Sequence, residues 1–549
     1  MKKRVLSILL CALILVAVAS CSKDTATESN TQSPASETTT TQPGESTQPS
    51  NTNIAEVTSA KDTLTVAYSG DRGTLDFYHN GGGTQYQMIG YNVMEQLLDF
   101  NLATGEPVWL LATSIEEISP IKWHVHLREG VTFSNGNPFT AQDVWFTLNY
   151  VNVTDGLTAP VPNIIYDDMN VIDDYTIEFN FTHYEVTSLS KFSTFVIYDE
   201  ESFDEELSST NPIGTGAYYV TEYVINSHVY LEARDDYWGG KPKIQHLIIR
   251  CLAEDAQKVN GITTETVDVV SVPRLDIEYV MSLDNYQTEF WPSHAVDVIN
   301  FNVAPGQIMD DPAARRAVCY AIDRETVLDL VYYGYGDIPE WPLANSLFDF
   351  EPEYSNKYDV YSHGYDPDLS RQLLEELGLT GKEFIIITNG SADYVRMAEI
   401  IQQNLRDVGL DAKINNYDSA SFRTVRAEPD SHQVWIYGAW APACTGVDIF
   451  ATYLSPAYTF GPYDYFNSEQ LKNYSSSSTG FMGNNAIRTI TDPVQAKATM
   501  TELLDYFDET MLWFAVTGRE NSLTYPKNVV ASPTMLNGNT FFKDWYWIA

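Results

Sequence analysis

The clearest hydrophobic pattern lies between residues 384 and 415, where a strand period gives way to a helix period. "FIIIT", Phe384–Thr388, is a short β-branched apolar run typical of a buried strand. In "SADYVRMAEIIQQNLRDVG" apolar residues recur every three or four positions, which predicts a helix with Ser391 as its cap and Gly409 as its stop. "LDAKINN" then starts a second strand. The segment therefore predicts a β-α-β unit with a parallel strand pair.

Two other stretches begin with Asp-Pro and end with Gly. "DDPAARRAVCYAIDRETVLDLVYYG" predicts one helix with Asp311 as its cap, Pro312 as its first residue and Gly334 as its stop. "DPDLSRQLLEELG" repeats this pattern between Asp366 and Gly378. Helices that alternate with short buried strands predict an α/β fold for this half of the chain.

The stretch 120–250 has a strand period instead. "IKWHVHL" and "YTIEFNF" alternate between apolar and polar residues, and "GAYYVTEYVINSHVYLEA" predicts a hairpin. Farther along, "HQVWIY" predicts a short buried strand, followed by the loop "YGAWAPACTGVDIF" with Trp440, Cys444 and Asp448. From its residues alone this loop is a catalytic site, a ligand cleft or a plain turn. The chain as a whole is α/β with an added β-rich region.

The N-terminus predicts export and lipidation. "MKKRVLSILLCALILVAVASC" has a basic start and an apolar run shorter than the roughly 20 residues of a bilayer span, which is typical of a signal peptide over residues 1–20. Its end, "VASC", resembles a bacterial lipobox and predicts lipidation of Cys21; the alternative is an ordinary signal cleaved near Ala19. Residues 21–61, rich in Ser, Thr, Gln and Pro, predict a flexible tether.

Size and charge exclude some functions. A chain of 549 residues is too long to fold around one hydrophobic core, so we expect two or more domains. The formal net charge of -42 argues against nucleic-acid binding, which needs a basic surface. After Cys11 and Cys21, only Cys251, Cys319 and Cys444 remain, with no CxxC pair, which predicts neither a disulfide framework nor a metal site.

Catalytic motifs are missing from the sequence. No GxSxG, HExxH or P-loop pattern occurs, so we predict no catalytic residue and no cofactor. His124 and His126 could share a strand face as metal ligands, but no third ligand stands nearby and a structural role is favoured. Gly81–Gly83 could cradle an anion, but no apolar strand precedes it, which favours a loop. A carboxylate pair stays an open alternative among 74 acidic residues.

Several long blocks resemble one family. "LREGVTFSNGNPFTAQDV", "NPIGTGAYYVTEY" (with Ala217 where proline is usual), "YWGGKPKIQHL" and "FNVAPGQIMDDPAARRAVCYAIDRETVL" are similar to blocks of the family-5 extracellular solute-binding proteins. These proteins are the oligopeptide, dipeptide and nickel receptors of ABC importers. The blocks keep the family order from about residue 62 to 549.

The resemblance implies a class II periplasmic-binding-protein-like fold, a two-lobed Venus flytrap. Lobe I would hold 62–298 plus 515–549, with an extra β-rich subdomain near 100–205. Lobe II would hold 299–514, and strands near "VINFNV" and "LWFAVTG" would form the hinge. Such a receptor binds its ligand between the lobes and delivers it to an ABC permease and ATPase complex. We expect a monomer, lipid-anchored on the extracytoplasmic face of a membrane, in a Gram-positive cell.

The loop after "HQVWIY" decides the expected ligand. In peptide receptors of the family, an aspartate shortly after a Gly-Trp pair binds the ligand's ammonium group. Here Ala439 replaces the glycine, Trp440 is kept, and Ala443 stands at the aspartate position. Either Asp448 takes over, or the ligand lacks an amine, because a buried amine needs a charged partner.

Three ligand classes follow from this. An oligopeptide is the first choice; an oligosaccharide or other amine-free ligand is second, since 35 Tyr and 11 Trp supply stacking faces. Nickel or haem is third, and a pheromone sensor or an enzyme stands outside these classes. Predicted ligand residues are Trp440, Asp448, Tyr68, Tyr437 and Trp435. The alternatives are a core role for Trp440, a helix cap for Asp448, and a core position for one of Trp435 and Tyr437.

Overall fold

The computed structural model describes residues 58–79, 84–161, 163–440, 444–453, 489–532 and 540–549. The predicted signal peptide, residues 21–57 of the predicted tether including Cys21, the glycines at 81–83 and Ala443 lie outside these residues. No helix within the described ranges is long and apolar enough to cross a membrane.

A four-stranded sheet contains both the start of the described chain and the predicted hairpin. Its order is β1 (Thr63–Tyr68), β10 (His246–Cys251), β9 (His228–Ala233) and β8 (Tyr218–Val224). β1 pairs with β10 in parallel and β8 with β9 antiparallel, which confirms the hairpin. The C-terminal residues Phe542 and Trp545 belong to the same hydrophobic core as Val66 and Leu231. Residues far apart in sequence therefore build one core.

A second sheet has a core of its own. Its order is β4 (Ala112–Ser119), β5 (Lys122–Leu127), β7 (Thr176–Asn180) and β6 (Asn170–Asp173), all antiparallel. Apolar residues of β5 and β7 alternate toward a cluster with α3 (Ala141–Val153), whose first turn is closed by a capping box. This sheet confirms the added β-rich region.

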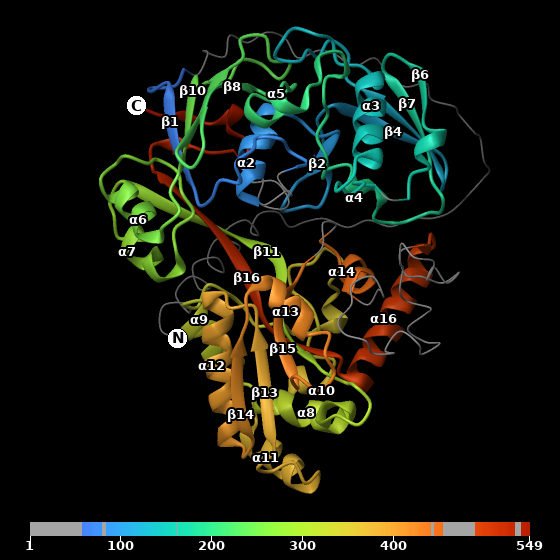
Figure 1. The fold of residues 1–549 in the computed structure, drawn as a ribbon, viewed down its shortest axis with the longest axis vertical. Coiled ribbons are helices and arrows are strands. Elements are labelled where there is room, and N and C mark those ends of the chain that lie inside the picture. Colours follow the sequence, from blue (N-terminus) through green and yellow to red (C-terminus); the bar gives the residue numbers. More distant parts are fainter. Residues whose placement is uncertain (1–57, 80–83, 162, 441–443, 454–488, 533–539) are drawn as a thin grey trace, which may run out of the picture. The chain divides into compact units, whose positions relative to one another are not determined.

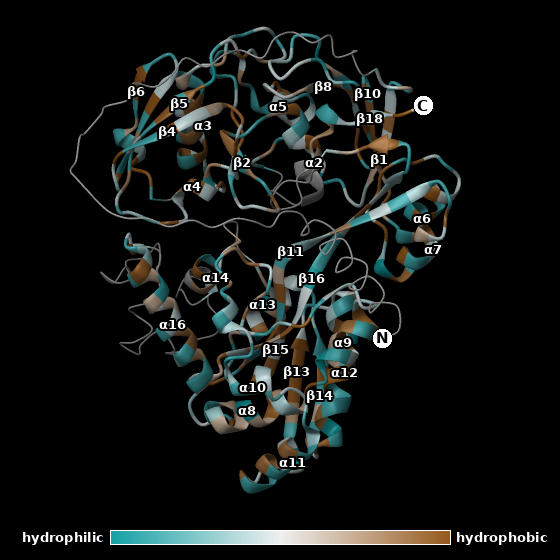
Figure 2. Cartoon of the chain, turned by 180° about the vertical axis from the view of Figure 1, so that it is seen from behind, coloured by the Kyte–Doolittle hydropathy of each residue, from teal (hydrophilic) through white to brown (hydrophobic). Residues whose placement is uncertain are grey.

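The third sheet has six strands and contains the predicted β-α-β unit (Figure 1). Its order is β12 (Gly336–Asp337), β16 (Trp513–Pro526), β11 (Tyr286–Phe301), β15 (Val434–Ala439), β13 (Glu383–Thr388) and β14 (Asp411–Asn416). β13 and β14 are parallel and are joined by α12 (Ala392–Asp407), as predicted. α12 buries Met397, Ala398 and Ile401, and its charged residues are exposed. The colours of Figure 2 show β13 as a hydrophobic strand.

The predicted single helix over 311–334 is wrong, because the structure has two helices there. α8 (Pro312–Ala321) ends before Ile322, which has extended backbone angles. α9 (Arg324–Val331) then starts with Asp323 as its cap, whose carboxylate accepts from the Thr326 N–H at 3.0 Å. An aspartate that caps a new turn competes with continuation of the old helix. The helix α11 (Pro367–Glu376) begins at its Asp366 cap as predicted.

β11 and β16 form a long antiparallel ribbon, pairing from Tyr286↔Pro526 to Asn300↔Trp513. One end of the ribbon packs with the core of the four-stranded sheet through Leu523, and the other end packs with the large core around the six-stranded sheet through Phe514. A bulge interrupts the ribbon at His294, whose φ is 54°. The ribbon thus joins two separate cores.

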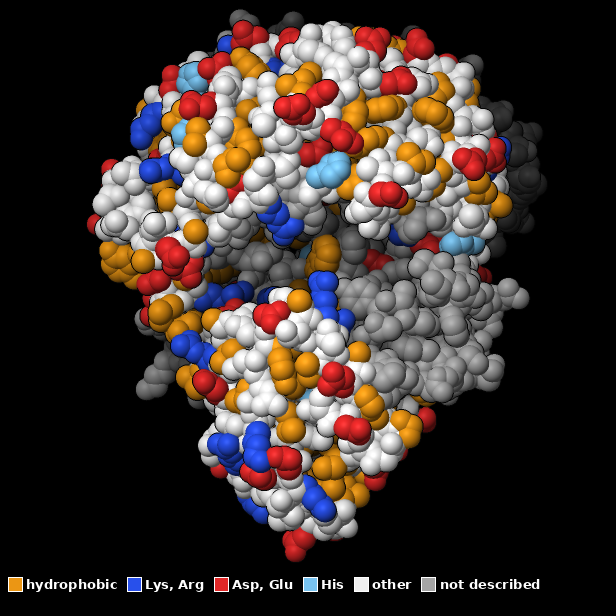
Figure 3. Space-filling model, viewed as in Figure 1, with side chains coloured by type: hydrophobic (Ala, Val, Ile, Leu, Met, Phe, Trp, Pro, Cys, Tyr) orange, Lys and Arg blue, Asp and Glu red, His pale blue; other side chains and the backbone are white. Residues whose placement is uncertain are grey.

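The remaining α-helices and strands of the described chain include short and long elements. They are α2 (Thr84–Val93), β2 (Leu98–Phe100), β3 (Pro107–Trp109), α4 (Ser188–Lys191), α5 (Glu205–Thr210), α6 (Asp255–Thr263), α7 (Ile277–Met281), α10 (Asp359–Ser362), α13 (Ser419–Val425), α14 (Gly446–Tyr453), α16 (Pro493–Thr510), β17 (Val529–Val530) and β18 (Tyr546–Trp547). Acidic side chains are scattered over the coloured part of the face seen in Figure 3, in keeping with the net charge of -42.

Candidate ligand-binding site

β15 is the buried strand predicted from "HQVWIY", and its residues differ in what they can offer a ligand. Trp435 is 1% exposed and packs in the large core, edge-on to His432 at 5.4 Å between ring centres. The structure therefore places Trp435 in the core, where it has no surface to offer a ligand. Tyr437 is half-buried and is the member of this pair that keeps accessible surface.

Trp440, directly after β15, is the exposed aromatic residue of the site. Its side chain is 42% exposed, while its backbone N–H donates to the Tyr453 hydroxyl at 3.0 Å. The Tyr453 hydroxyl also lies 3.4 Å from the Gly438 carbonyl oxygen, and its ring lies 6.2 Å from that of Tyr437. Tyr453, from α14, thus fixes the backbone that presents Trp440. A large aromatic face on a fixed backbone suits stacking against a ligand.

A buried ion pair lies behind this strand end. Asp297 on β11 is fully buried and accepts from Arg519 Nε at 2.8 Å, from the Tyr332 hydroxyl at 2.5 Å and from the Thr517 hydroxyl at 3.1 Å. Burial alone would lower the pKa of Arg519, but the charge of Asp297 outweighs it and raises that pKa well above its usual value. The pair joins the two strands of the ribbon.

Gly438 shows how closely this pair approaches β15. A Cβ at Gly438 would lie 2.0 Å from Arg519 Nη2 and 2.7 Å from the Tyr394 hydroxyl, so the position has no room for a side chain. Arg519 Nη2 donates to that same hydroxyl at 2.6 Å. The glycine lets the guanidinium pack against the strand immediately before Trp440.

Asp448 is buried rather than presented to a ligand. It lies in the first turn of α14 with 4% exposure, and its backbone N–H donates to the Thr445 hydroxyl at 3.2 Å. The N-terminus of α14 is instead capped by Asp349, whose two carboxylate oxygens accept from the Gly446 N–H at 2.6 Å and the Val447 N–H at 3.1 Å. Burial raises the pKa of Asp349, and the nearby Asp448 raises it further.

Tyr68 lies at the end of β1, in the core of the four-stranded sheet. Its side chain is buried, and Tyr68 pairs with Cys251 on the neighbouring strand β10. Burial and the neighbouring Asp71 raise the pKa of Tyr68. The structure thus groups Trp440, Tyr437 and Tyr453, whereas Asp448 lies beside Asp349 and Tyr68 beside Cys251.

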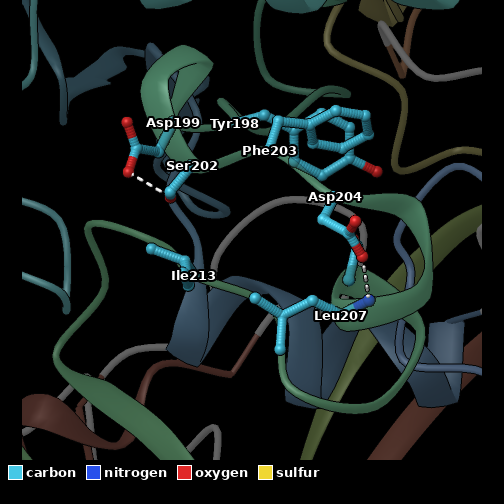
Figure 4. Close-up of a pocket in the computed structure, with 8 residues that line it drawn as sticks. Tyr198, Asp199, Ser202, Phe203, Asp204, Leu207 and Ile213 are labelled. Carbon is cyan, nitrogen blue, oxygen red and sulfur yellow. Dashed lines mark hydrogen bonds between the residues drawn. The ribbon is translucent and has the colours of Figure 1, made fainter.

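Two of the cavities lined by described residues differ greatly in size. One of about 20 Å³ lies between Tyr198, Phe203 and Leu207 (Figure 4) and has room for about one water molecule. The other, of about 400 Å³, adjoins Asp349 and the start of α14. Its lining residues are Phe100, Thr104, Gly105, Val186, Thr187, Leu189, Ser190, Phe348, Asp349, Thr445 and Val447.

The histidines at 124 and 126 have carboxylate neighbours. His124 Nε2 lies 2.9 Å from Glu178, and His126 Nε2 lies 3.8 Å from Glu116. Lys122 and then His124 lower the pKa of Glu178 to about 2. Among the residues that the structure describes, no group of three or more His, Cys, Asp or Glu could hold a metal ion.

Comparison with known proteins defines the class first. The fold is that of the two-lobed periplasmic binding proteins. The crystal structure of a putative peptide binding protein AppA from Clostridium difficile matches with a TM-score of 0.76 and 17% identity, over 88% of this chain and 100% of that one. The crystal structure of the ABC transporter substrate binding protein CtaP from Listeria monocytogenes matches with a TM-score of 0.75 and 18% identity, over 89% of this chain and 100% of that one.

The family follows from the sequence. The model for bacterial extracellular solute-binding proteins, family 5 Middle, matches residues 106–461, and the chain belongs to this family. The dipeptide-binding protein of Escherichia coli (strain K12) is 26% identical over 462 residues, which cover 75% of this chain and 82% of that relative. The family consists of solute-binding proteins rather than enzymes.

Sequence reasoning missed several residues around the site. Asp349 is one of 74 acidic residues, and nothing in "LFDFEPEY" shows that it caps a helix almost 100 positions later. Arg519 and Asp297 are 222 positions apart and meet only because β11 and β16 pair. The one available signal was Arg519 itself, a charged residue directly after the apolar run "LWFAVTG".

Proposed function

We propose that this protein is the substrate-binding component of an ABC importer for oligopeptides. The observation that carries the proposal is Trp440, an exposed aromatic side chain on a backbone fixed by Tyr453, in a chain that matches the family over residues 106–461. A relative named as a dipeptide-binding protein and a structural neighbour described as a putative peptide binding protein support a peptide cargo.

Trp440 and Tyr437 are the ligand-contacting residues of this proposal. Both retain accessible surface at the end of β15 and stack on the ligand, while backbone groups hydrogen-bond its main chain. Tyr68 and Asp448 contribute only if ligand binding uncovers them, since both are buried here.

The ribbon of β11 and β16 is the hinge of the proposed receptor. Lobe I comprises residues 62–298 and 515–549, with its extra subdomain near 100–205, and lobe II comprises 299–514. The ribbon carries residues of two different cores, as a connection between lobes must. A ligand that contacts both lobes favours the closed state.

The proposed protein is a monomeric lipoprotein on the extracytoplasmic face of the membrane, in a Gram-positive cell. The motif "VASC" directs acylation of Cys21, and the polar stretch 21–61 tethers the binding domains. A tether holds the receptor near the permease and raises its effective concentration there.

Native mass spectrometry of the purified protein tests the cargo. A co-purified mass that fragments into amino acids supports the proposal, whereas a carbohydrate mass supports the amine-free alternative and contradicts ours.

Calorimetric titration of the identified cargo then compares Trp440→Ala with Tyr365→Ala, a control whose side chain is 45% exposed. We expect the Trp440 variant to lose about tenfold or more in affinity, from about 1–3 kcal/mol of stacking and burial. Equal affinities in both variants refute the role of Trp440.

A further inference from the structure

The cavity of about 400 Å³ beside α14 has a lining of mixed chemistry. It is formed by residues 100–105, 186–190, 348–349 and 445–447. Phe100, Leu189 and Phe348 supply apolar surface, and Asp349 supplies a carboxylate. A largely apolar cavity with a few polar groups is the usual composition of a small-molecule site.

Asp349 has donors but no cationic partner. Its oxygens accept from two backbone N–H groups of α14, and no Lys, Arg or His forms an ion pair with it among the described residues. A second carboxylate, that of Asp448, lies close enough to raise the pKa of Asp349. A negative charge at this wall of the cavity is therefore stabilised by backbone N–H groups, and a cation would stabilise it further.

Thr187 gives independent evidence for a ligand. It lines the same cavity and is 4% exposed, and its hydroxyl oxygen has no hydrogen-bond partner in the described part of the chain. Buried polar groups in native proteins are normally satisfied, so a hydroxyl without a partner indicates a group that arrives from outside. Thr187 comes from the segment before α4 and Asp349 from the loop after β12, so the cavity brings together two polar groups from distant segments.

We propose that this cavity binds an ammonium group carried on an apolar stem, with Asp349 as its charge partner and Thr187 as a second hydrogen-bond acceptor. Phe100, Leu189 and Phe348 pack against the stem. The inference rests on the proposed function in one respect: it takes this ammonium group to be part of the cargo. The group is then either a peptide's amino terminus or a lysine side chain. It assigns ammonium recognition to Asp349 instead of the buried Asp448.

A purely structural role for Asp349, as the cap of α14, is the competing explanation. Asp349→Asn keeps one side-chain oxygen for the Gly446 N–H but removes the charge. Asp366→Asn is the matched control, because Asp366 caps α11 through the Leu369 N–H at 2.9 Å and does not line the cavity. Both variants change a cap, and only Asp349→Asn changes the cavity.

Butylammonium binding to the full-length protein, measured by saturation-transfer NMR and calorimetry, tests the cavity itself. We expect butylammonium to bind the wild type and the Asp366→Asn variant. Asp349→Asn should weaken binding by about tenfold or more, because a charge-assisted hydrogen bond is lost. Thr187→Val should weaken it less, and butanol should bind all variants equally weakly. No butylammonium binding, or equal binding to wild type and Asp349→Asn, overturns the proposal.

Peptide probes separate this proposal from the cargo assignment. Trialanine tests an amino terminus, its N-acetyl derivative removes that group, and an N-acetylated peptide with one lysine tests a side-chain ammonium. Peptide binding that does not change with N-acetylation, with lysine or with Asp349→Asn refutes the ammonium subsite. That result remains consistent with the proposed peptide receptor. Butylammonium binding that depends on Asp349, without binding of any peptide, supports the subsite and contradicts the peptide cargo.

Discussion

Replacing Arg519 by methionine tests whether the buried ion pair holds the ribbon together. In the wild type Arg519 donates to Asp297 on the opposite strand and to Tyr394, and Asp297 is fully buried. Methionine fills much of the same volume but leaves the Asp297 carboxylate with neutral hydroxyl partners, such as those of Tyr332 and Thr517, in place of the guanidinium. The variant therefore buries an uncompensated charge.

The expected loss follows from the burial of the two partners. Removing one member of a buried pair costs about 3–5 kcal/mol, whereas an exposed pair contributes about 0.2–1 kcal/mol. The Arg519 side chain is 29% exposed, so we expect the lower end, about 3 kcal/mol, or more than about 100-fold in the unfolding constant. Asp297→Asn should cost less, because the guanidinium left behind can still reach water.

Urea unfolding, followed by both circular dichroism and tryptophan fluorescence, measures these losses. Arg371→Met is the control, since its pair with Asp368 is exposed at 49% and 90% and should contribute less than about 1 kcal/mol. The two probes must give coincident transitions for the free energies to be compared. A loss for Arg519→Met no larger than that of Arg371→Met would refute the claim that the pair stabilises the ribbon.

Two further predictions concern the anchor and the pH dependence of stability. Cys21→Ala should release the protein from the membrane into the soluble fraction, and a variant that stays membrane-bound without lipid contradicts the lipobox assignment. Lys122 and then His124 lower the pKa of Glu178 from 4.5 to about 2. The ionised Glu178 carboxylate therefore stabilises the folded protein above pH 4.5, and this contribution is lost as the pH falls toward about 2. The stability difference between wild type and Glu178→Gln, measured by urea unfolding, should shrink across that window; a constant difference would mean that Glu178 does not titrate there.

Local elements could be predicted well because their signals are local. The β-α-β unit at 383–416 follows from apolar periodicity, and the helix at 367–376 follows from the Asp-Pro start. The same rules failed at Asp323, where a cap residue inside a continuous helical pattern starts a second helix. A capping side chain and a surface aspartate look alike in sequence, and only the local backbone separates them.

The candidate site could be predicted only in part. The strand end with Trp440 was located from its pattern, but the burial of Trp435, Asp448 and Tyr68 was not, because burial depends on segments that pack from elsewhere in the chain. Asp349 and Thr187, which share the cavity, are separated by more than 150 positions. No spacing rule joins residues at that distance.

The sequence by itself determined the family, the α/β class and the strands and helices with clear periodicity, since these depend on periodicity, caps and ordered blocks along the chain. The tertiary structure alone decided which polar groups meet. It joined Asp297 to Arg519 through strand pairing, and it placed Asp349 rather than Asp448 at the cavity. The physical reason is that side-chain contacts form where elements pack, and packing joins residues that no local pattern relates.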